Sequence, residues 1–371
     1  MINNTGRVIL IICFTIFLLA CSKQEPTTKK DVWGQIEGTD VYLYTLSNSN
    51  GITIKITNYG GIITSLIVPD KKGAFDDIVL GFDNLKQYLE PHPSFGAVIG
   101  RFANRIENAT FNIDSTTYRL TKNIGDDILH GNNEFDCVIW DSQMISNAYG
   151  NGIKLHYLSK DGANGFPGNV HAYVSYTLSE SNDLRVTFEA KTDKKTHINM
   201  TQHSYFNLSP NHKTIYNHQV EINANQYIRY DKTVEPSRTM ASLKNKTWDL
   251  SKLTKLGDSI HAIAPNGYNH CYVLNKPLNK LEQVAQVIEP YSGRTLKVST
   301  TQPGIVFYTG NYLDSTLNGK YGNTYAQHAG LCLESQHYPD APNNSNFPTT
   351  LLIPGETYKE VAIYTFGLLN E

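Results

Sequence analysis

The feature that most constrains this chain is an alternation of apolar and polar residues with a period of two, repeated along much of its length. Residues 52–57 read Ile-Thr-Ile-Lys-Ile-Thr, and residues 170–178 and 184–191 repeat the pattern with larger apolar side chains. Successive side chains of a β-strand point to opposite faces, so this period indicates strands with one buried and one solvated face. The Ser-Glu-Ser-Asn-Asp segment at 179–183 has the composition of a hairpin loop between two such strands.

Helical patterns are few and short, and the best of them cover residues 84–89 and 250–253. Strands and helices do not alternate, which disfavours a doubly wound α/β fold. No repeat of fixed period and no change of composition after Lys30 marks a second domain. We therefore expect an all-β fold, a single large antiparallel β-sandwich over residues 31–371, with further strands at 153–158, 219–222, 296–299, 305–309 and 359–365.

The charge balance argues against one class of partner. The 371 residues include 32 Lys and Arg against 34 Asp and Glu, so the formal net charge is −2, and only 18% of the residues are charged. Binding to nucleic acid phosphates requires a clustered basic surface, so we expect no nucleic-acid partner. Neutral polar residues, among them 23 Tyr, take the place of the missing charges, which suits a chain rich in strands.

The N-terminal residues have the features of an export signal. Residues 8–19 are apolar except for Thr15, and Arg7 precedes them. As a helix they would span about 18 Å, too little to cross a bilayer, so we interpret residues 1–20 as a cleaved signal peptide. The Leu-Leu-Ala-Cys ending at 18–21 resembles the lipobox of bacterial lipoproteins, in which the cysteine, here Cys21, carries the lipid.

This ending implies a protein of the bacterial cell envelope, anchored through Cys21 to a membrane on its periplasmic or outer-surface side. Several acyl chains on one residue hold a protein stably at a membrane, whereas a single chain is marginal. Residues 21–30 lack apolar periodicity and predict a flexible tether to the folded domain. The alternative is an ordinary secretory signal followed by a chance cysteine.

Three further cysteines, Cys137, Cys271 and Cys332, form an odd set without CxxC spacing. Each has apolar or aromatic neighbours, as in Leu-Cys-Leu at 331–333. Buried free thiols are therefore favoured over a disulfide or a metal site.

Common catalytic motifs are missing from the sequence. It has no GxGxxG, GxxxxGK[ST], HExxH or GxSxG pattern, so common nucleotide-binding, zinc-protease and α/β-hydrolase interpretations have no support. Instead, charged or imidazole side chains stand among uncharged polar residues in four segments: GRFANRI at 100–106, LHG at 129–131, NMTQHSYFNL at 199–208 and HAGLCLESQHYPD at 328–340.

At these segments the sequence resembles the aldose 1-epimerases, also called galactose mutarotases. More pieces match in the same order, so the resemblance extends from about residue 31 to residue 366: TNYGG at 57–61, DIVLGF at 77–82, GYNH at 267–270 and TQPG at 301–304. The resemblance implies a large β-sandwich of the galactose mutarotase type, in agreement with the period of two. It also implies an isomerase that interconverts the α and β anomers of free aldohexoses, such as galactose and glucose, by acid–base catalysed ring opening without a cofactor or metal.

The resemblance assigns the acid–base pair to two residues. Glu334 corresponds to the general base that takes the proton of the C1 hydroxyl, and His203 corresponds to the general acid that protonates the ring oxygen. An unperturbed imidazole titrates near pH 6.5, so a neighbouring carboxylate would keep His203 protonated around neutral pH. Simple alternation along residues 331–334 leaves the face occupied by Glu334 uncertain.

The resemblance also implies a set of sugar-binding residues. Arg105 and His130 correspond to residues that contact the sugar near its ring oxygen and C1, where an arginine stabilises developing negative charge. Asn104 and Gln302 fall at neighbouring positions that face sugar hydroxyls. Arg101, four residues before Arg105, is expected to be structural.

One position departs from the family pattern. The family usually has Gly-[Tyr/Phe]-Asp-His where this chain has Asn269 in Gly-Tyr-Asn-His. An asparagine still accepts a hydrogen bond through its carbonyl but lacks the negative charge, so we expect weaker or altered sugar binding with the acid–base pair intact. Apolar sugar faces pack on aromatic rings, and the matched segments offer candidate rings at Phe102, Tyr205, Tyr268 and Tyr338.

Three other interpretations of the sequence remain open. A non-catalytic carbohydrate-binding protein on the same fold is favoured by Asn269. A glycoside hydrolase needs two carboxylates beside the scissile bond, and the matched segments offer only Glu334 and the peripheral Asp340. A metal site would have to come from the remaining histidines of the matched segments, which lack ligand spacing: His270, His328 and His337. Both a monomer and a homodimer are compatible with the sequence.

Overall fold

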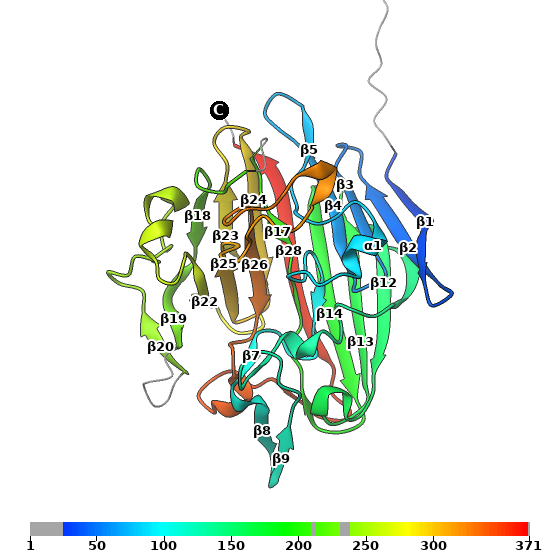
Figure 1. The fold of residues 1–371 in the computed structure, drawn as a ribbon, viewed down its shortest axis with the longest axis vertical. Coiled ribbons are helices and arrows are strands. Elements are labelled where there is room, and N and C mark those ends of the chain that lie inside the picture. The colour runs from blue at the N-terminus through cyan, green and yellow to red at the C-terminus, as the bar shows by residue number, and fades with distance from the viewer. Residues whose placement is uncertain (1–24, 210–212, 231–237, 370–371) are drawn as a thin grey trace, which may run out of the picture.

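The computed structural model describes residues 25–209, 213–230 and 238–369, and it consists mainly of antiparallel strands in three large sheets (Figure 1). The largest sheet has nine strands, in the order β11 (Asp141–Asn147), β12 (Gly150–Ser159), β13 (Val170–Leu178), β14 (Asp183–Thr192), β28 (Tyr358–Leu368), β24 (Arg294–Thr300), β23 (Glu282–Ile288), β18 (Gln219–Ile222) and β21 (Thr254–Lys255).

Two further sheets face the nine-stranded one across the core. The six-stranded sheet has the order β17 (Tyr205–Phe206), β26 (Leu331–Gln336), β25 (Gly304–Tyr308), β22 (Asn269–Leu274), β19 (Ala224–Tyr230) and β20 (Arg238–Ser242). The five-stranded sheet is formed in chain order by β1 (Thr27–Ile36), β2 (Thr39–Ser47), β3 (Thr53–Thr57), β4 (Ile63–Pro69) and β5 (Phe75–Asp77).

Smaller elements connect these sheets. Two-stranded pairs are formed by β6 (Val98–Ile99) with β16 (Thr201–Gln202), β7 (Arg105–Ile106) with β10 (Ile128–Leu129), β8 (Thr110–Ile113) with β9 (Thr116–Arg119), and β15 (Thr196–His197) with β27 (Leu351–Leu352). The helical elements are α1 (Leu85–Tyr88) and the 3₁₀ turns η1 (Glu107–Ala109), η2 (His130–Asn132), η3 (Ala163–Gly165), η4 (Leu256–Asp258), η5 (Ile260–Ala262), η6 (Lys320–Gly322) and η7 (Ala341–Asn343).

The largest hydrophobic cluster of the described residues lies between the layers. It takes Ile54 from the five-stranded sheet, Val174 from the nine-stranded sheet and Leu333 from the six-stranded sheet, each almost fully buried. The alternation that characterises the sequence puts these side chains inward, as in β13, where buried and partly exposed residues alternate from Val170 to Tyr176. The predicted antiparallel β-sandwich is therefore confirmed.

The expected strands are confirmed, whereas only one of the two expected helices is present. Asn84 caps α1 by accepting a hydrogen bond from the backbone N–H of Gln87, which is a strong helix start signal. The helix predicted at 250–253 is wrong. The carbonyl of Leu250 instead accepts the backbone N–H of Ile222, so a partner distant in sequence takes the hydrogen bond that a helix would have used.

The predicted tether is too long at its C-terminal end. Residues 27–30 belong to β1 and pair in antiparallel register with residues 44–47 of β2. The proposed signal peptide and Cys21 lie outside the described residues. None of the helices in the described part of the chain has the length and apolarity needed to cross a bilayer.

Of the three cysteines expected to be buried free thiols, two are confirmed. Cys271 and Cys332 are buried and unbridged, but Cys137 is exposed. Its neighbours Phe135 and Trp140 turn into the core while Cys137 itself is exposed, so apolar neighbours in the sequence did not bury the thiol.

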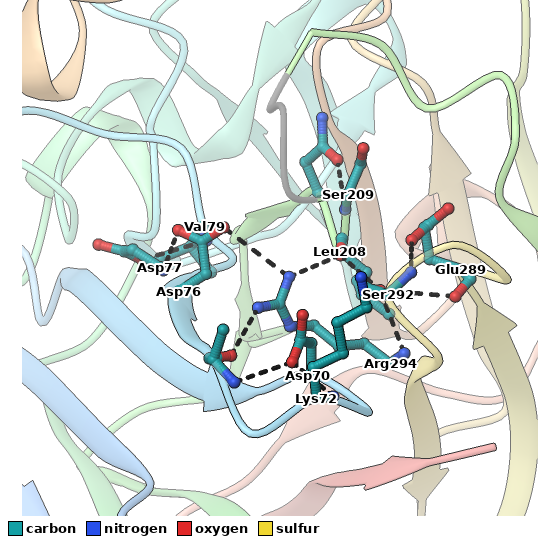
Figure 2. Close-up of polar contacts among 12 residues, drawn as sticks. Asp70, Lys72, Asp76, Asp77, Val79, Leu208, Ser209, Glu289, Ser292 and Arg294 are labelled. Carbon is teal, nitrogen blue, oxygen red and sulfur yellow. Dashed lines mark hydrogen bonds and ion pairs between the residues drawn. The ribbon is translucent and has the colours of Figure 1, made fainter. Parts of the chain in front are cut away.

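In another part of the molecule, a buried guanidinium contacts three segments that connect strands. Arg294 donates from Nη1 to the carbonyl of Leu208 (3.1 Å) and from Nη2 to the carbonyl of Ala74 (3.3 Å), and Nη1 lies 3.8 Å from Oδ2 of Asp76 (Figure 2). Ser292 also donates to Leu208. We call Ala74, Asp76, Leu208, Ser292 and Arg294 the Arg294 cluster; it joins the β4–β5 turn, the segment after β17 and the β23–β24 hairpin.

Candidate active site

The register of the six-stranded sheet gathers the candidate residues on one face. Directly opposite residues of antiparallel strands point to the same side. One such row across β17, β26, β25 and β22 consists of Tyr205, Cys332, Tyr308 and Asn269, and the next row across β26, β25 and β22 consists of Glu334, Val306 and Cys271. We call the side that carries these rows the site face. Leu331 and Leu333 point the other way, into the core, which settles the orientation of Glu334.

Glu334 meets two imidazoles on the site face. Nε2 of His203 lies 3.5 Å from Oε1 of Glu334, and the ring of His130 stands nearly perpendicular to that of His203 with 5.3 Å between centroids. One ligand-type atom from each of the three residues lies within 4.8 Å of the other two. We call these residues the His–His–Glu cluster. The sequence-based pairing of Glu334 with His203, and the proximity of His130, agree with this geometry.

His203 is held by backbone pairing just before β17. Its N–H donates to the carbonyl of Ala97 (2.9 Å), and its carbonyl accepts the N–H of Gly96 (3.0 Å). Gly96 has a φ of +69°, and a Cβ there would stand 2.3 Å from the carbonyl oxygen of Ile63. Only glycine fits this position without displacing the chain that supports His203.

His130 is oriented by the GRFANRI segment. Its backbone N–H donates to the carbonyl of Asn104 (3.1 Å), and its ring Nδ1 accepts the backbone N–H of Asn104 (3.3 Å). Nδ1 is therefore the unprotonated nitrogen, and the neutral ring carries its proton on Nε2. Gly131 lets the turn approach this segment, because a Cβ there would stand 2.3 Å from the carbonyl oxygen of Gly100.

Burial controls the charges of the His–His–Glu cluster. Glu334 is 2% exposed, and desolvation raises its pKa to about 8. The same desolvation lowers the pKa of His203 to about 4, and it lowers the pKa of His130 well below the usual value with added repulsion from His203 and Arg105. The expectation that a carboxylate keeps His203 protonated is therefore wrong for the protein alone: between these pKa values the pair of Glu334 and His203 holds one proton, and burial places it on Glu334.

Hydrogen bonding leaves one oxygen of Glu334 available. Among the described residues Oε2 has no hydrogen-bond partner, although it is buried. An unsatisfied buried carboxylate oxygen costs stability, and such atoms are uncommon in folded proteins. The arrangement suits a group that completes its hydrogen bonds only when a polar ligand binds.

The two arginines of the GRFANRI segment have different surroundings. Arg101 is fully buried, and its guanidinium donates to the hydroxyl of Ser159 and to the carbonyls of Pro167, Gly168 and Lys160, which agrees with the expected structural role. Arg105 keeps 29% of its side chain exposed and makes a long ion pair with Asp127 (3.8 Å). Its fixed charge and remaining donors can serve a bound polar ligand.

The remaining predicted sugar contacts divide into two groups. Asn104 lies between Arg105 and the backbone of His130 at the margin of the cluster. Asn269 lies on the site face with its side chain exposed. Gln302, by contrast, is buried, and its amide is occupied by protein groups: Oε1 lies 2.7 Å from Nδ1 of His337, and Nε2 donates to the hydroxyl of Tyr358 (3.1 Å).

Aromatic rings extend from the cluster to the surface. Tyr205 stacks on His203 (5.1 Å), Tyr308 stands edge-on to Tyr205 (6.0 Å), and the exposed Tyr312 stacks on Tyr308 (6.4 Å). Of the four predicted platforms, Tyr205 contacts the cluster through this stacking; all four rings, Tyr205 included, are buried within hydrophobic clusters. Sequence reasoning missed Tyr308, whose only signal was its place in the strand after TQPG.

The structure gives little support to the metal and glycosidase interpretations. His270 stacks on Trp248, His328 bonds the carbonyl of Asn266, and His337 bonds Gln302, so each of these histidines has its own protein partner. The donor atoms of the His–His–Glu cluster are close enough together for a cation, but the hydrogen bond from Asn104 leaves the proton of His130 on Nε2, where a metal ion would need a lone pair.

The second carboxylate considered for a glycosidase is also occupied. Asp340 is 2% exposed and accepts hydrogen bonds from the backbone N–H of Glu107 and the amide of Asn343. It also lies 4.0 Å from the guanidinium of Arg238. This carboxylate therefore holds loops together and leaves Glu334 as the carboxylate of the cluster.

Comparison with known proteins gives the same assignment over most of the chain. Residues 42–365 match the model of the family described as Aldose 1-epimerase. This chain belongs to that family. Curated relatives include galactose mutarotase of Sus scrofa, 42% identical over 86% of this chain and 92% of its own length, and aldose 1-epimerase of Escherichia coli K12, 32% identical over 89% and 96%.

Solved structures agree with the family assignment. The galactose 1-epimerase of Lactobacillus acidophilus NCFM superposes with a TM-score of 0.82 at 26% identity and covers 93% of this chain and 100% of its own. The GalM/aldose epimerase homologue of C. elegans superposes with a TM-score of 0.81 at 28% identity, over 88% and 99%. The chain is accordingly an isomerase of the aldose 1-epimerase family, and its reaction is the interconversion of anomers.

Proposed function

We propose that this aldose 1-epimerase acts on free aldohexoses such as galactose and glucose, with Glu334 and His203 as its acid–base pair. The observation that supports this most directly is the meeting of a buried carboxylate and two imidazoles on the site face, with one carboxylate oxygen unpartnered among the described residues. Ring opening requires one group that takes the C1 hydroxyl proton and one that protonates the ring oxygen, both within hydrogen-bond reach.

In the proposed reaction the shared proton moves between the two groups. Sugar hydroxyls hydrogen-bond the carboxylate of Glu334 and favour its charged form, so that the proton passes to His203. Glu334 then takes the C1 hydroxyl proton while the bond between C1 and the ring oxygen breaks, and the ring oxygen takes the proton of His203. The open aldehyde rotates about the C1–C2 bond, and the reverse transfers close the ring with the other configuration.

Two further residues stabilise oxygen atoms of the sugar in this scheme. His130 offers Nε2–H as a neutral donor, because its Nδ1 is taken by the backbone of Asn104. Arg105 offers a charge that it keeps throughout the reaction. Asn269 accepts a hydrogen bond from a sugar hydroxyl without adding a charge to the site face.

Polarimetry tests the proposal. Fresh α-D-galactose and α-D-glucose are followed with micromolar protein, and we expect equilibration far faster than in buffer alone. Glu334→Gln abolishes the acceleration. Glu360→Gln leaves it unchanged, because Glu360 is a buried glutamate on β28 that is hydrogen-bonded to Thr301. A rate equal to the buffer blank for the parent protein, or full activity in Glu334→Gln, would contradict the assignment.

A second candidate function is carbohydrate binding without catalysis, and Asn269 favours it. A hydrogen bond from the sugar to a charged acceptor contributes about 1.5–3 kcal/mol, whereas one to the neutral amide of Asn269 contributes about 0.5–1.5 kcal/mol. Calorimetric binding of galactose by a protein that gives no polarimetric acceleration would support this alternative. Acceleration that depends on Glu334 would eliminate it.

We further propose that residues 1–20 direct export and that a lipid on Cys21 anchors the protein in the bacterial cell envelope. The apolar segment behind Arg7 and the Leu-Leu-Ala-Cys ending support this proposal. Because β1 begins at Thr27, residues 22–26 are left to link the lipid to the domain. Membrane fractionation tests it: Cys21→Ser should appear in the soluble fraction, and continued membrane association would refute lipidation at this residue.

A further inference from the structure

A buried thiol contacts Nδ1 of His203, whereas the other ring nitrogen, Nε2, lies next to Glu334. Cys332 lies on the site face two residues before Glu334 and is 0% exposed. Its Sγ is 3.7 Å from Nδ1 of His203, and the described residues contain no other hydrogen-bond partner of this thiol. Burial raises the pKa of the thiol well above its usual value, so the sulfur keeps its proton.

A thiol provides what an acid–base imidazole needs from a partner, because it can both donate and accept. In the neutral ring Nδ1 either accepts the S–H proton or donates to the sulfur, according to the tautomer. When His203 is an imidazolium, Nδ1 carries a proton and donates to the sulfur. A backbone N–H could pair only with an unprotonated Nδ1, and a backbone carbonyl only with a protonated one.

The neighbouring imidazole, that of His130, has a partner at Nδ1 that can only donate. Nδ1 of His130 accepts a backbone N–H from Asn104, which can only donate. Protonation of His130 would break this bond, so His130 stays a neutral donor. The two rings lie 5.3 Å apart, and the partner at Nδ1 distinguishes His203, which gains and loses a proton in the proposed reaction, from His130, which does not.

We infer that Cys332 is a positioning residue that orients the ring of His203 and keeps a hydrogen bond to its Nδ1 through both protonation states of the reaction. The consequence for the rate rests on the proposed role of His203 as the general acid. The hydrogen bond itself does not, since it depends only on the contact between the thiol and Nδ1.

Steady-state kinetics with three variants test the effect on the rate. Cys332→Ala should lower kcat about three- to ten-fold with KM changed less than about two-fold, since one hydrogen bond of about 0.5–1.5 kcal/mol is lost at the acid–base pair. Cys332→Ser, which restores a donor and acceptor, should recover most of kcat. Cys271→Ala is the matched control: it removes a buried thiol from the adjacent row of the site face and should leave kcat unchanged.

Imidazole ¹H–¹⁵N correlation spectra test the hydrogen bond at Nδ1 without requiring activity, with His203→Gln used to assign the signal. The Nδ1 signal of His203 should shift in Cys332→Ala and return toward its position in the parent in Cys332→Ser. An unchanged Nδ1 signal and unchanged kcat in Cys332→Ala, or an equal loss of kcat in Cys271→Ala, would overturn the inference. A parent protein without mutarotation would refute the proposed function, and the spectra would then still decide the role of Cys332.

Discussion

The His–His–Glu cluster and the Arg294 cluster are both buried, and they differ in how far neighbouring groups compensate the buried charge. Around Arg294 the neighbours oppose its charge: Asp76, Asp70 and Glu289 partly offset the cost of desolvating the guanidinium, and two backbone carbonyls accept hydrogen bonds from its Nη atoms, so that among the described residues only Nε lacks a hydrogen-bond partner (Figure 2). Around Glu334 desolvation alone governs the pKa, and one carboxylate oxygen has no partner among the described residues.

The difference separates a structural use of a buried charge from a functional one. A buried charge that is paired and hydrogen-bonded stabilises the loops that supply its partners. A buried carboxylate without such partners lowers stability, and its raised pKa brings it close to the pH at which proton transfer is useful. The two clusters should therefore respond in opposite ways to mutation, and the stability contribution of Glu334 should depend on pH.

The largest expected effect is on the rate. Glu334→Gln should lower kcat about 10³-fold, within the range for loss of a general base. The same change should raise the free energy of unfolding at pH 9, because it removes an uncompensated buried charge. Polarimetry and urea denaturation measure the two effects, and a variant that is both inactive and less stable at pH 9 would show that Glu334 is structural.

The Arg294 cluster should show the reverse. Arg294→Met removes the donor to the buried carbonyl of Leu208 and to the carbonyl of Ala74, and we expect the free energy of unfolding to fall by about 2–4 kcal/mol. Folded enzyme should keep kcat within about two-fold, because no contact to the His–His–Glu cluster is lost. Lys297→Met, an exposed change on the same strand, is the control and should leave stability unchanged. A large loss of kcat in folded Arg294→Met would break the comparison.

The pH dependence of stability follows from the two pKa shifts. Between the unfolded pKa of a histidine, about 6.5, and the folded pKa of Glu334, about 8, the native pair retains one proton that the unfolded chain has released. Stability therefore falls as pH rises through this window, by about 2 kcal/mol in all. Urea midpoints at pH 6.5 and 8.5 measure the slope, and Glu334→Gln should remove it; an equal slope in both proteins would contradict the raised pKa.

The smallest expected effect concerns the missing charge on the site face. Asn269→Asp should lower KM for galactose about five-fold, the difference of about 1 kcal/mol between a charged and a neutral hydrogen bond. The effect should shrink at high salt. Asn147→Asp on β11 carries the same change of net charge on an exposed strand of the nine-stranded sheet and should leave KM unchanged. An equal change in both variants would assign the effect to net charge rather than to the site.

Local features of the sequence determined much of what this protein is. The period of two placed the strands, because side-chain alternation is a property of each strand by itself. The segments around Arg105, His130, His203 and Glu334 indicated the family and the reaction, because the chemistry needs those groups next to fixed neighbours. Where the pattern was short, as at residues 250–253, a hydrogen bond from distant Ile222 decided the local structure instead.

Only the tertiary structure decided how these groups act together. The register between strands far apart in the chain put Glu334 on the same face as Cys332 and Asn269, which no local pattern along β26 could determine. Burial, a collective property of the packed sheets, raised the pKa of Glu334 and lowered that of His203, so that the carboxyl group has the higher pKa of the two. Long-range contacts also engaged the amide of Gln302 with His337, so a residue that the sequence placed among the sugar contacts binds the protein itself.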